Sequence, residues 1–181
     1  MSSPGFVVHH TGGDATWAFA LRDAGWQHVV CVEPDPQVAV RLLLAGLPVR
    51  EAELSPSEAR CLRGHLALLW IASGSAGHHE LAFGIRVLMA VDAFAPTWVV
   101  LSRPVQASGV EPGIDALAAE LGTRRKFVDT VVIGDARVTW AGPIRLPPPE
   151  GPPRAAELTA RLARAHSAWT ASALVPVAAS S

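Results

Sequence analysis

The stretch LALLWIASGSAGHHE, from Leu66 to Glu80, joins an unbroken apolar run to a small-residue turn and two histidines. An unbroken apolar run of this length is typical of a strand that is buried on both faces of a parallel sheet. Small residues directly after such a strand leave room for a ligand or for another backbone. The stretch therefore predicts a central strand whose carboxyl end borders a site.

Strand-like and helix-like patterns alternate on both sides of this strand. Such alternation is typical of parallel strands joined by helices that cover the sheet. We therefore predict an α/β fold with a doubly wound, mostly parallel sheet. The expected strands are 6–10, 28–33, 47–51, 66–72, 98–102 and a hairpin over 127–142 turning at Gly134 and Asp135, and the expected helices are 14–25, 34–46, 55–64, 79–94 and one near 112–122.

Composition divides the chain into four parts. The proline-rich run LPPPEGPP is typical of a stiff connector, and the helix after it carries Leu158, Leu162, Ala165 and Trp169 on one face. That face has two interpretations: packing on its own domain, or binding a partner. The parts are an α/β domain at 1–145, the connector at 146–153, an amphipathic helix at 154–174 and a tail at 175–181.

Charge and apolar content limit the classes of partner. Half of the residues are hydrophobic, 17% are charged, and the formal net charge is −1. A nucleic-acid-binding protein normally carries a basic excess, so we expect no nucleic acid. The low charge suggests that part of the surface is covered by a partner. The start of the chain lacks a signal-peptide pattern and no apolar run reaches about 18 residues, so we expect a cytoplasmic protein without membrane contact.

The two cysteines do not indicate a metal site or a disulfide framework. Cys31 and Cys61 both stand in apolar surroundings, where a small buried side chain is the usual role. Adjacent histidines rarely chelate one ion together, so we expect no metal.

Polar residues follow the ends of several predicted strands. Ligands of open α/β sheets bind outside the carboxyl ends of the strands, so these residues are expected to converge in one cleft. The five segments concerned are His9–Asp14, Glu33–Asp35, Glu51–Glu53, Ser73–Glu80 and Ser102–Arg103.

An ordered series of these segments resembles the DNA (cytosine-5) methyltransferases. HTGGDATWAFALRDAGW and VVCVEPDP resemble the family's first two motifs, LALLWIASGSAG stands where the family has its Pro-Cys-Gln strand, and APTWVVLSRPV stands where it has Glu-Asn-Val. The resemblance covers about residues 6 to 105. It implies a Rossmann-like methyltransferase sheet, here without the family's target-recognition domain.

The departures from the family concern its cofactor and its chemistry. Thr11 stands where the family stacks an aromatic ring on the adenine of S-adenosylmethionine, while Gly13 and Glu33 remain as a vestige of the cofactor site. Ser75 replaces the catalytic cysteine, and a serine without an adjacent base is a far poorer nucleophile than a thiolate. Arg103 stands within the triplet that replaces Glu-Asn-Val. The resemblance therefore implies the fold and excludes a working cytosine methyltransferase.

The remaining strand-end residues suit acid–base and anion chemistry. His9, His10, His78 and His79 titrate in the range needed for proton transfer near pH 7, although in each pair one imidazole could face solvent and the other cap a helix. Asp14 is a base or, in the favoured interpretation, a helix cap. Arg103 is an anion clamp or, equally, one member of a surface ion pair.

Two classes of function follow. In its small size and its lost Pro-Cys-Gln, the chain resembles the shortened methyltransferase-like proteins that pair in bacterial biosynthesis of azinomycin-type aziridine amino acids. That resemblance implies a cofactor-free subunit of a hetero-oligomer that closes an aziridine ring on a carrier-bound substrate by displacing sulfate. The alternative is a non-catalytic partner or regulatory subunit of a DNA (cytosine-5) methyltransferase-like protein, with residual S-adenosylmethionine binding through Glu33.

Overall fold

Seven strands form one sheet in the order β3-β2-β1-β4-β5-β7-β6. The computed structural model describes residues 6–72, 80–105, 112–125 and 127–173. The strands are β1 Phe6–His10, β2 Val29–Val32, β3 Val49–Arg50, β4 Leu66–Ala72, β5 Trp98–Pro104, β6 Phe127–Ile133 and β7 Ala136–Gly142. The helices are α1 Thr16–Asp23, α2 Pro36–Leu44, α3 Pro56–Leu62, α4 Glu80–Phe94, α5 Pro112–Arg124 and α6 Ala155–Ala173.

The predicted α/β class and doubly wound sheet are confirmed. β4 is buried over its whole length, as its unbroken apolar run indicates, and it lies between β1 and β5 with parallel pairing on both sides. β7 pairs antiparallel with both β5 and β6, so the last two strands form the predicted hairpin at one edge. The turn of this hairpin contains Gly134, whose φ of 61° favours glycine.

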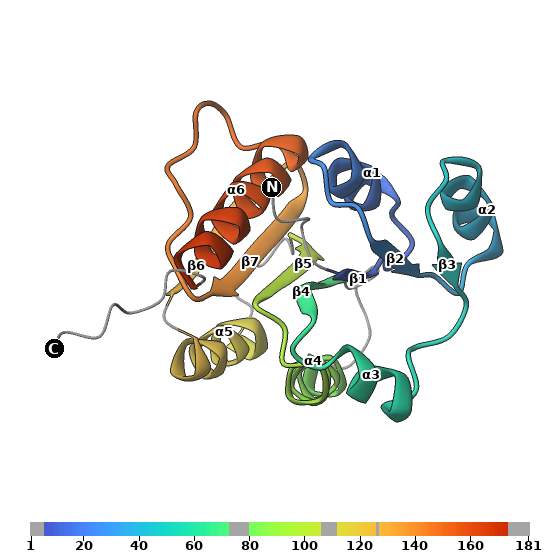
Figure 1. Cartoon of the computed structure of the whole chain (residues 1–181), viewed down its shortest axis with the longest axis horizontal. Coiled ribbons are helices and arrows are strands. Elements are labelled where there is room, and N and C mark those ends of the chain that lie inside the picture. The colour runs from blue at the N-terminus through green and yellow to red at the C-terminus, as the bar shows by residue number, and fades with distance from the viewer. Residues whose placement is uncertain (1–5, 73–79, 106–111, 126, 174–181) are drawn as a thin grey trace, which may run out of the picture.

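Helices cover both faces of the sheet. Figure 1 shows α1, α2 and α6 on one face and α3, α4 and α5 on the other. The first face is dominated by large aromatic side chains, among them Trp17, Trp70 and Trp98. The second is mainly aliphatic and includes Val87 and Leu101. Among the described helices, none is long and apolar enough to cross a membrane.

The C-terminal helix packs on its own sheet, the first of its two interpretations. Leu158 and Leu162 are fully buried in the aromatic face. Trp26 Nε1 donates to the Thr159 carbonyl at 3.4 Å, and Thr159 Oγ1 donates to the Ala20 carbonyl at 3.0 Å. These bonds tie α6 to α1 and to the loop that follows α1. The division of the chain into domain, connector and tail stays a prediction.

The first helix begins two residues later than its pattern predicts. Its N-cap is Ala15, with no side-chain cap, so the favoured interpretation of Asp14 as the cap is wrong. Asp14 Oδ1 instead accepts from the Thr16 N–H at 2.9 Å, which closes a local turn ahead of the helix. The helix ends as predicted before Gly25, whose φ is 88°.

A capping box starts α3, as its sequence predicts. Ser55 Oγ accepts from the Glu58 N–H, and Glu58 Oε2 accepts from the Ser55 N–H at 2.8 Å. This backbone bond, with the Ser55 hydroxyl and Arg50 beside it, lowers the pKa of Glu58. The box therefore fixes the direction in which the short helix leaves the loop after β3.

Ser55→Ala is expected to lower the free energy of unfolding by about 1 kcal/mol, because it removes the acceptor of the Glu58 N–H and the hydroxyl that binds the Glu58 carboxylate. Urea unfolding of the full chain measures this. Ser167→Ala, at an exposed position inside α6, is the matched control and is expected to change stability by less than about 0.5 kcal/mol. Equal losses in the two variants would mean that the box contributes nothing.

Candidate functional site

A glycine turn joins β1 to α1 at the carboxyl edge of the sheet. Thr11 is buried and its N–H donates to the Val32 carbonyl at 3.2 Å, which extends the pairing of β1 with β2. Gly12 and Gly13 follow with φ values of 60° and 88°, in the left-handed region that glycine tolerates without strain. The turn therefore brings the segment before α1 close to the end of β2.

The Glu33 carboxylate is held by this turn and by its own loop. Glu33 is only 1% exposed. Its Oε2 accepts from the Thr11 hydroxyl and, at 3.1 Å, from the Gly13 N–H, while Oε1 accepts from the Asp35 N–H at 2.6 Å. Both carboxylate oxygens are thus paired with donors from the chain itself, and the group links the ends of β1 and β2.

His9 lies inside the aromatic face rather than at the edge of the sheet. Its ring is completely buried and stacks on Trp70 with the ring centres 5.8 Å apart. Neither ring nitrogen has a hydrogen-bond partner among the described residues. Burial, with a smaller contribution from His10, lowers the pKa of His9 to about 3. Its imidazole is therefore neutral near pH 7.

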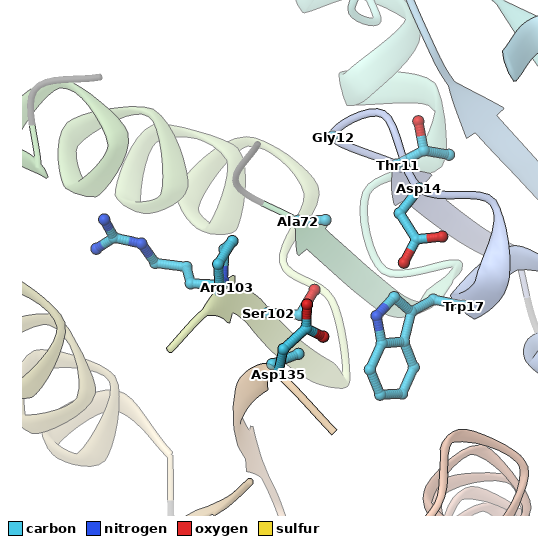
Figure 2. A pocket seen from close by; sticks show the side chains of 10 residues that line it. Thr11, Gly12, Asp14, Trp17, Ala72, Ser102, Arg103 and Asp135 are labelled. Atoms are coloured by element: carbon cyan, nitrogen blue, oxygen red, sulfur yellow. The ribbon is translucent and has the colours of Figure 1, made fainter. Parts of the chain in front are cut away.

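A cavity of about 180 Å³ opens where β1, β4 and β5 end and the β6–β7 hairpin turns. Figure 2 shows Asp14 between Thr11 and Trp17 on one side, and Asp135 beside Ser102 on the other. Trp17 is 5% exposed and offers an apolar wall. The arrangement places two carboxylates around a small space with an indole beside it, which suits a small cationic group.

Arg103 borders the same cavity, but its side chain leaves it. Figure 2 shows the guanidinium extending away from Asp14 and Asp135. The residue is only 8% exposed, and both interpretations of its role stay predictions. The neighbouring Ser102 has the opposite orientation, and its hydroxyl accepts from Trp70 Nε1 at 2.9 Å on the aromatic face. Successive residues of a strand point to opposite faces, which separates the two side chains.

Among the residues that the structure describes, the other predicted site residues do not line this cavity. His10 is half-buried and lines a second, apolar cavity between α3 and α4. Ser75, His78 and His79 lie outside the described residues. Of the predicted catalytic residues that the structure describes, Asp14 and Arg103 line one cavity. Their roles stay predictions.

Two residues that line the cavity, Asp135 and Trp17, are not marked as site residues by the sequence pattern. Asp135 stands out there only as a turn residue. The topology explains its position, because β6 runs parallel to β5 through the intervening antiparallel β7, so the turn after β6 returns to the carboxyl edge. Trp17 follows the glycine turn within the first turn of α1, and its apolar spacing indicates only a core role.

Cysteine and metal chemistry find little support in the described part of the chain. No group of three or more histidine, cysteine, aspartate or glutamate side chains able to hold a metal ion occurs there. Burial, with the Glu33 carboxylate second, raises the pKa of the Cys31 thiol to about 12, so this thiol is not a nucleophile at neutral pH. Cys61, expected to be buried, is exposed because Ala59 carries the buried face of α3.

Solved structures with a similar fold include methyltransferases. The 16S rRNA methyltransferase RsmC of T. Thermophilus, in complex with AdoMet and guanosine, aligns with a TM-score of 0.51 and 19% identity over 84% of this chain and 38% of its own. Human methyltransferase-like protein 13, in complex with SAH, aligns with a TM-score of 0.53 and 16% identity over 89% of this chain and 80% of its own. The methyltransferase domain of bacterial CtHen1 aligns with a TM-score of 0.53 and 12% identity over 77% of this chain and 90% of its own. No protein-family model and no curated protein matches the sequence.

These likenesses establish a Rossmann-like methyltransferase fold, with this chain spanning well under half the length of the RsmC structure. The fold family implies S-adenosylmethionine, which the turn and the acidic residue at the end of β2 would hold. Of the glycine turn of the DNA (cytosine-5) methyltransferases only Gly13 remains, and Glu33 does not fit the cofactor-binding role that the resemblance gives it. Its carboxylate is closed off from solvent, and both oxygens already accept from the chain.

Proposed function

We propose that this chain is a subunit of a hetero-oligomeric biosynthetic enzyme, in which a fold of the DNA (cytosine-5) methyltransferase type performs ring closure without a cofactor. The reaction is aziridine formation on a carrier-bound amino-acid intermediate of bacterial secondary metabolism, by intramolecular displacement of sulfate. The observation that carries the proposal is the pair of carboxylates, Asp14 and Asp135, around a small cavity at the strand ends. The closed Glu33 carboxylate supports a reaction without S-adenosylmethionine.

The carboxylates suit the first step of this chemistry, which binds the substrate ammonium and removes its proton. A substrate amine is an ammonium ion at neutral pH, and a carboxylate within reach both binds it and accepts its proton. Asp14 is exposed at the cavity and uses one oxygen, Oδ1, for the Thr16 N–H. Its other oxygen is the proposed proton acceptor. Asp135 then holds the amine from the opposite side.

The second step requires a path for the leaving group. The nitrogen lone pair attacks the neighbouring carbon, the carbon–oxygen bond to the sulfate ester breaks, and its electron pair leaves with sulfate. In-line displacement places the nucleophile and the leaving group on opposite sides of the carbon, so the proton acceptor and the anion clamp belong at separate places. Arg103 borders the same cavity and is the proposed clamp for the departing sulfate, a role that requires its guanidinium to turn toward the cavity from the orientation in Figure 2.

Asp14→Asn is expected to lower the rate of sulfate release by about 100-fold or more, because it removes the proposed base. The assay uses the full chain co-purified with the partner subunit that the proposal assigns to it, and a carrier-bound amino sulfate ester as substrate. Asp23→Asn, at another exposed aspartate of the α1 region, is the matched control and is expected to retain the parent rate. A parent-like rate in Asp14→Asn, or tight S-adenosylmethionine binding by calorimetry, would refute the proposal.

A non-catalytic partner role is the second candidate, and one surface favours it. On α2, the side chains of Val40, Leu43 and Leu44 are 53%, 57% and 84% exposed. Their spacing puts them on one outer face of the helix, where an apolar surface marks a contact with another protein. This surface also fits the hetero-oligomer of the first proposal. The two candidates differ in the Asp14→Asn result, which a purely structural subunit would leave unchanged.

A further inference from the structure

A larger cavity lies on the other face of the sheet, between α3, α4 and the ends of β1 and β4. Its volume is about 540 Å³, within the range of small-molecule sites. Ile71 and Phe94 are buried at its inner wall, and Ile85 and Met89 lie toward solvent on α4. Of the described residues that line it, only His10 and Glu53 carry polar side chains.

The outer wall of this cavity exposes apolar surface that a ligand would cover. Ile85 is 50% exposed and Met89 is 68% exposed. The two residues are four positions apart on α4, so they lie one above the other on the same face of the helix. Covering them removes apolar area from water, which favours binding. An apolar group of a ligand is therefore expected to bind here more tightly than a polar group.

Neighbouring residues connect this cavity with the carboxylate cavity. His10 and Ile71 line the apolar cavity, while Thr11 and Ala72, the next residue in each segment, line the carboxylate cavity. The two cavities thus meet the same two strand ends from opposite faces of the sheet. A single extended ligand that crosses this edge reaches both, with a cationic end on one side and an apolar end on the other.

We propose that the α3–α4 cavity binds an aromatic group of the substrate whose amine lies between Asp14 and Asp135. The inference rests on the proposed function for the amine end, and on the cavity alone for the aromatic end. A flat ring suits a space bounded by the Phe94 ring and the Met89 thioether, because aromatic edges and polarisable sulfur both contact rings favourably.

The test is fluorescence titration of the isolated full chain with N-phenyl-1-naphthylamine, a neutral aromatic probe. We expect saturable binding at one site. Met89→Asp puts a charge at the mouth of the cavity and should weaken binding at least tenfold. Val132→Asp, at an apolar position on β6 that is 47% exposed and does not line the cavity, is the matched control and should bind as the parent does. Ala93→Trp, which fills the cavity, should abolish binding while thermal unfolding reports that the chain is folded.

Three outcomes would overturn the inference: no saturable binding, equal binding by Met89→Asp and the parent, or displacement of the probe by S-adenosylmethionine. The last would mean that the cavity receives the adenine of that cofactor instead. The proposed function fails separately, because Asp14→Asn changes sulfate release and should leave probe binding at the parent value.

Discussion

Gly142→Ala should destabilise the protein by about 3 kcal/mol or more, although it adds only one methyl group. A Cβ built on Gly142 meets two ring carbons of Trp98 at 2.1 Å and a third at 2.9 Å. Trp98 is fully buried at the start of β5, in the aromatic face of the sheet, so its ring has no space into which it can move. Either the ring leaves its rotamer or β7 moves away from β5.

Urea unfolding of the parent and the variant measures this loss. Gly122→Ala, on α5, is the matched control, because its new Cβ meets Val128 at an ordinary 3.6 Å and alanine is the better helix former. That variant should be unchanged or up to about 1 kcal/mol more stable. In the background of Trp98→Leu, the cost of Gly142→Ala should shrink, since the clashing ring is gone. An undiminished cost in that background would contradict the clash.

His9→Phe should remove a large part of the loss of stability on acidification. The pKa of His9 falls from its ordinary 6.5 to about 3 on folding, so between these values the unfolded chain binds a proton that the folded chain does not. This contribution to stability is complete above pH 6.5 and is lost as the pH falls toward 3, at about 1.4 kcal/mol per pH unit. Phenylalanine retains the stacking on Trp70 and cannot be protonated.

The measurement is the free energy of unfolding at pH 6.5 and pH 4.5. The parent should lose about 2 kcal/mol more than His9→Phe over this interval. His65→Gln, at an exposed histidine, is the control and should follow the parent. Parallel pH profiles for the parent and His9→Phe would show that His9 titrates normally, and would return it to the set of acid–base groups available near pH 7.

Most of the sheet could be predicted because the local sequence is consistent with it. The unbroken apolar run of β4 needs no distant information, and the Ser55–Glu58 capping box and Gly25 mark helix ends by chemistry within a few residues. Asp14 shows the limit of such rules. An aspartate two residues before a helix offers the same side chain to a cap or to a turn, and the backbone conformation decides between them.

The site was harder to predict because it depends on segments that are far apart in the chain. Asp14 and Asp135 line one cavity only because the hairpin turn returns to the carboxyl edge, and neither residue type indicates this locally. Arg103 was correctly placed at a strand end, but the alternation of side chains turns its guanidinium away from the carboxylates. The close approach of Gly142 to Trp98 likewise follows from strand register, which periodicity alone does not give.

The packing of α6 against α1 also determines when this face of the sheet can be completed during synthesis. Ribosomes release a chain from its N-terminus, so the first helix emerges long before the segment that shelters it. Until residues near Thr159 leave the exit tunnel, Trp26 and the Ala20 carbonyl lack their hydrogen-bond partners. The part of the aromatic face that α6 covers is exposed to water during that time. The nascent polypeptide therefore exposes these groups until the residues around Thr159 have been translated.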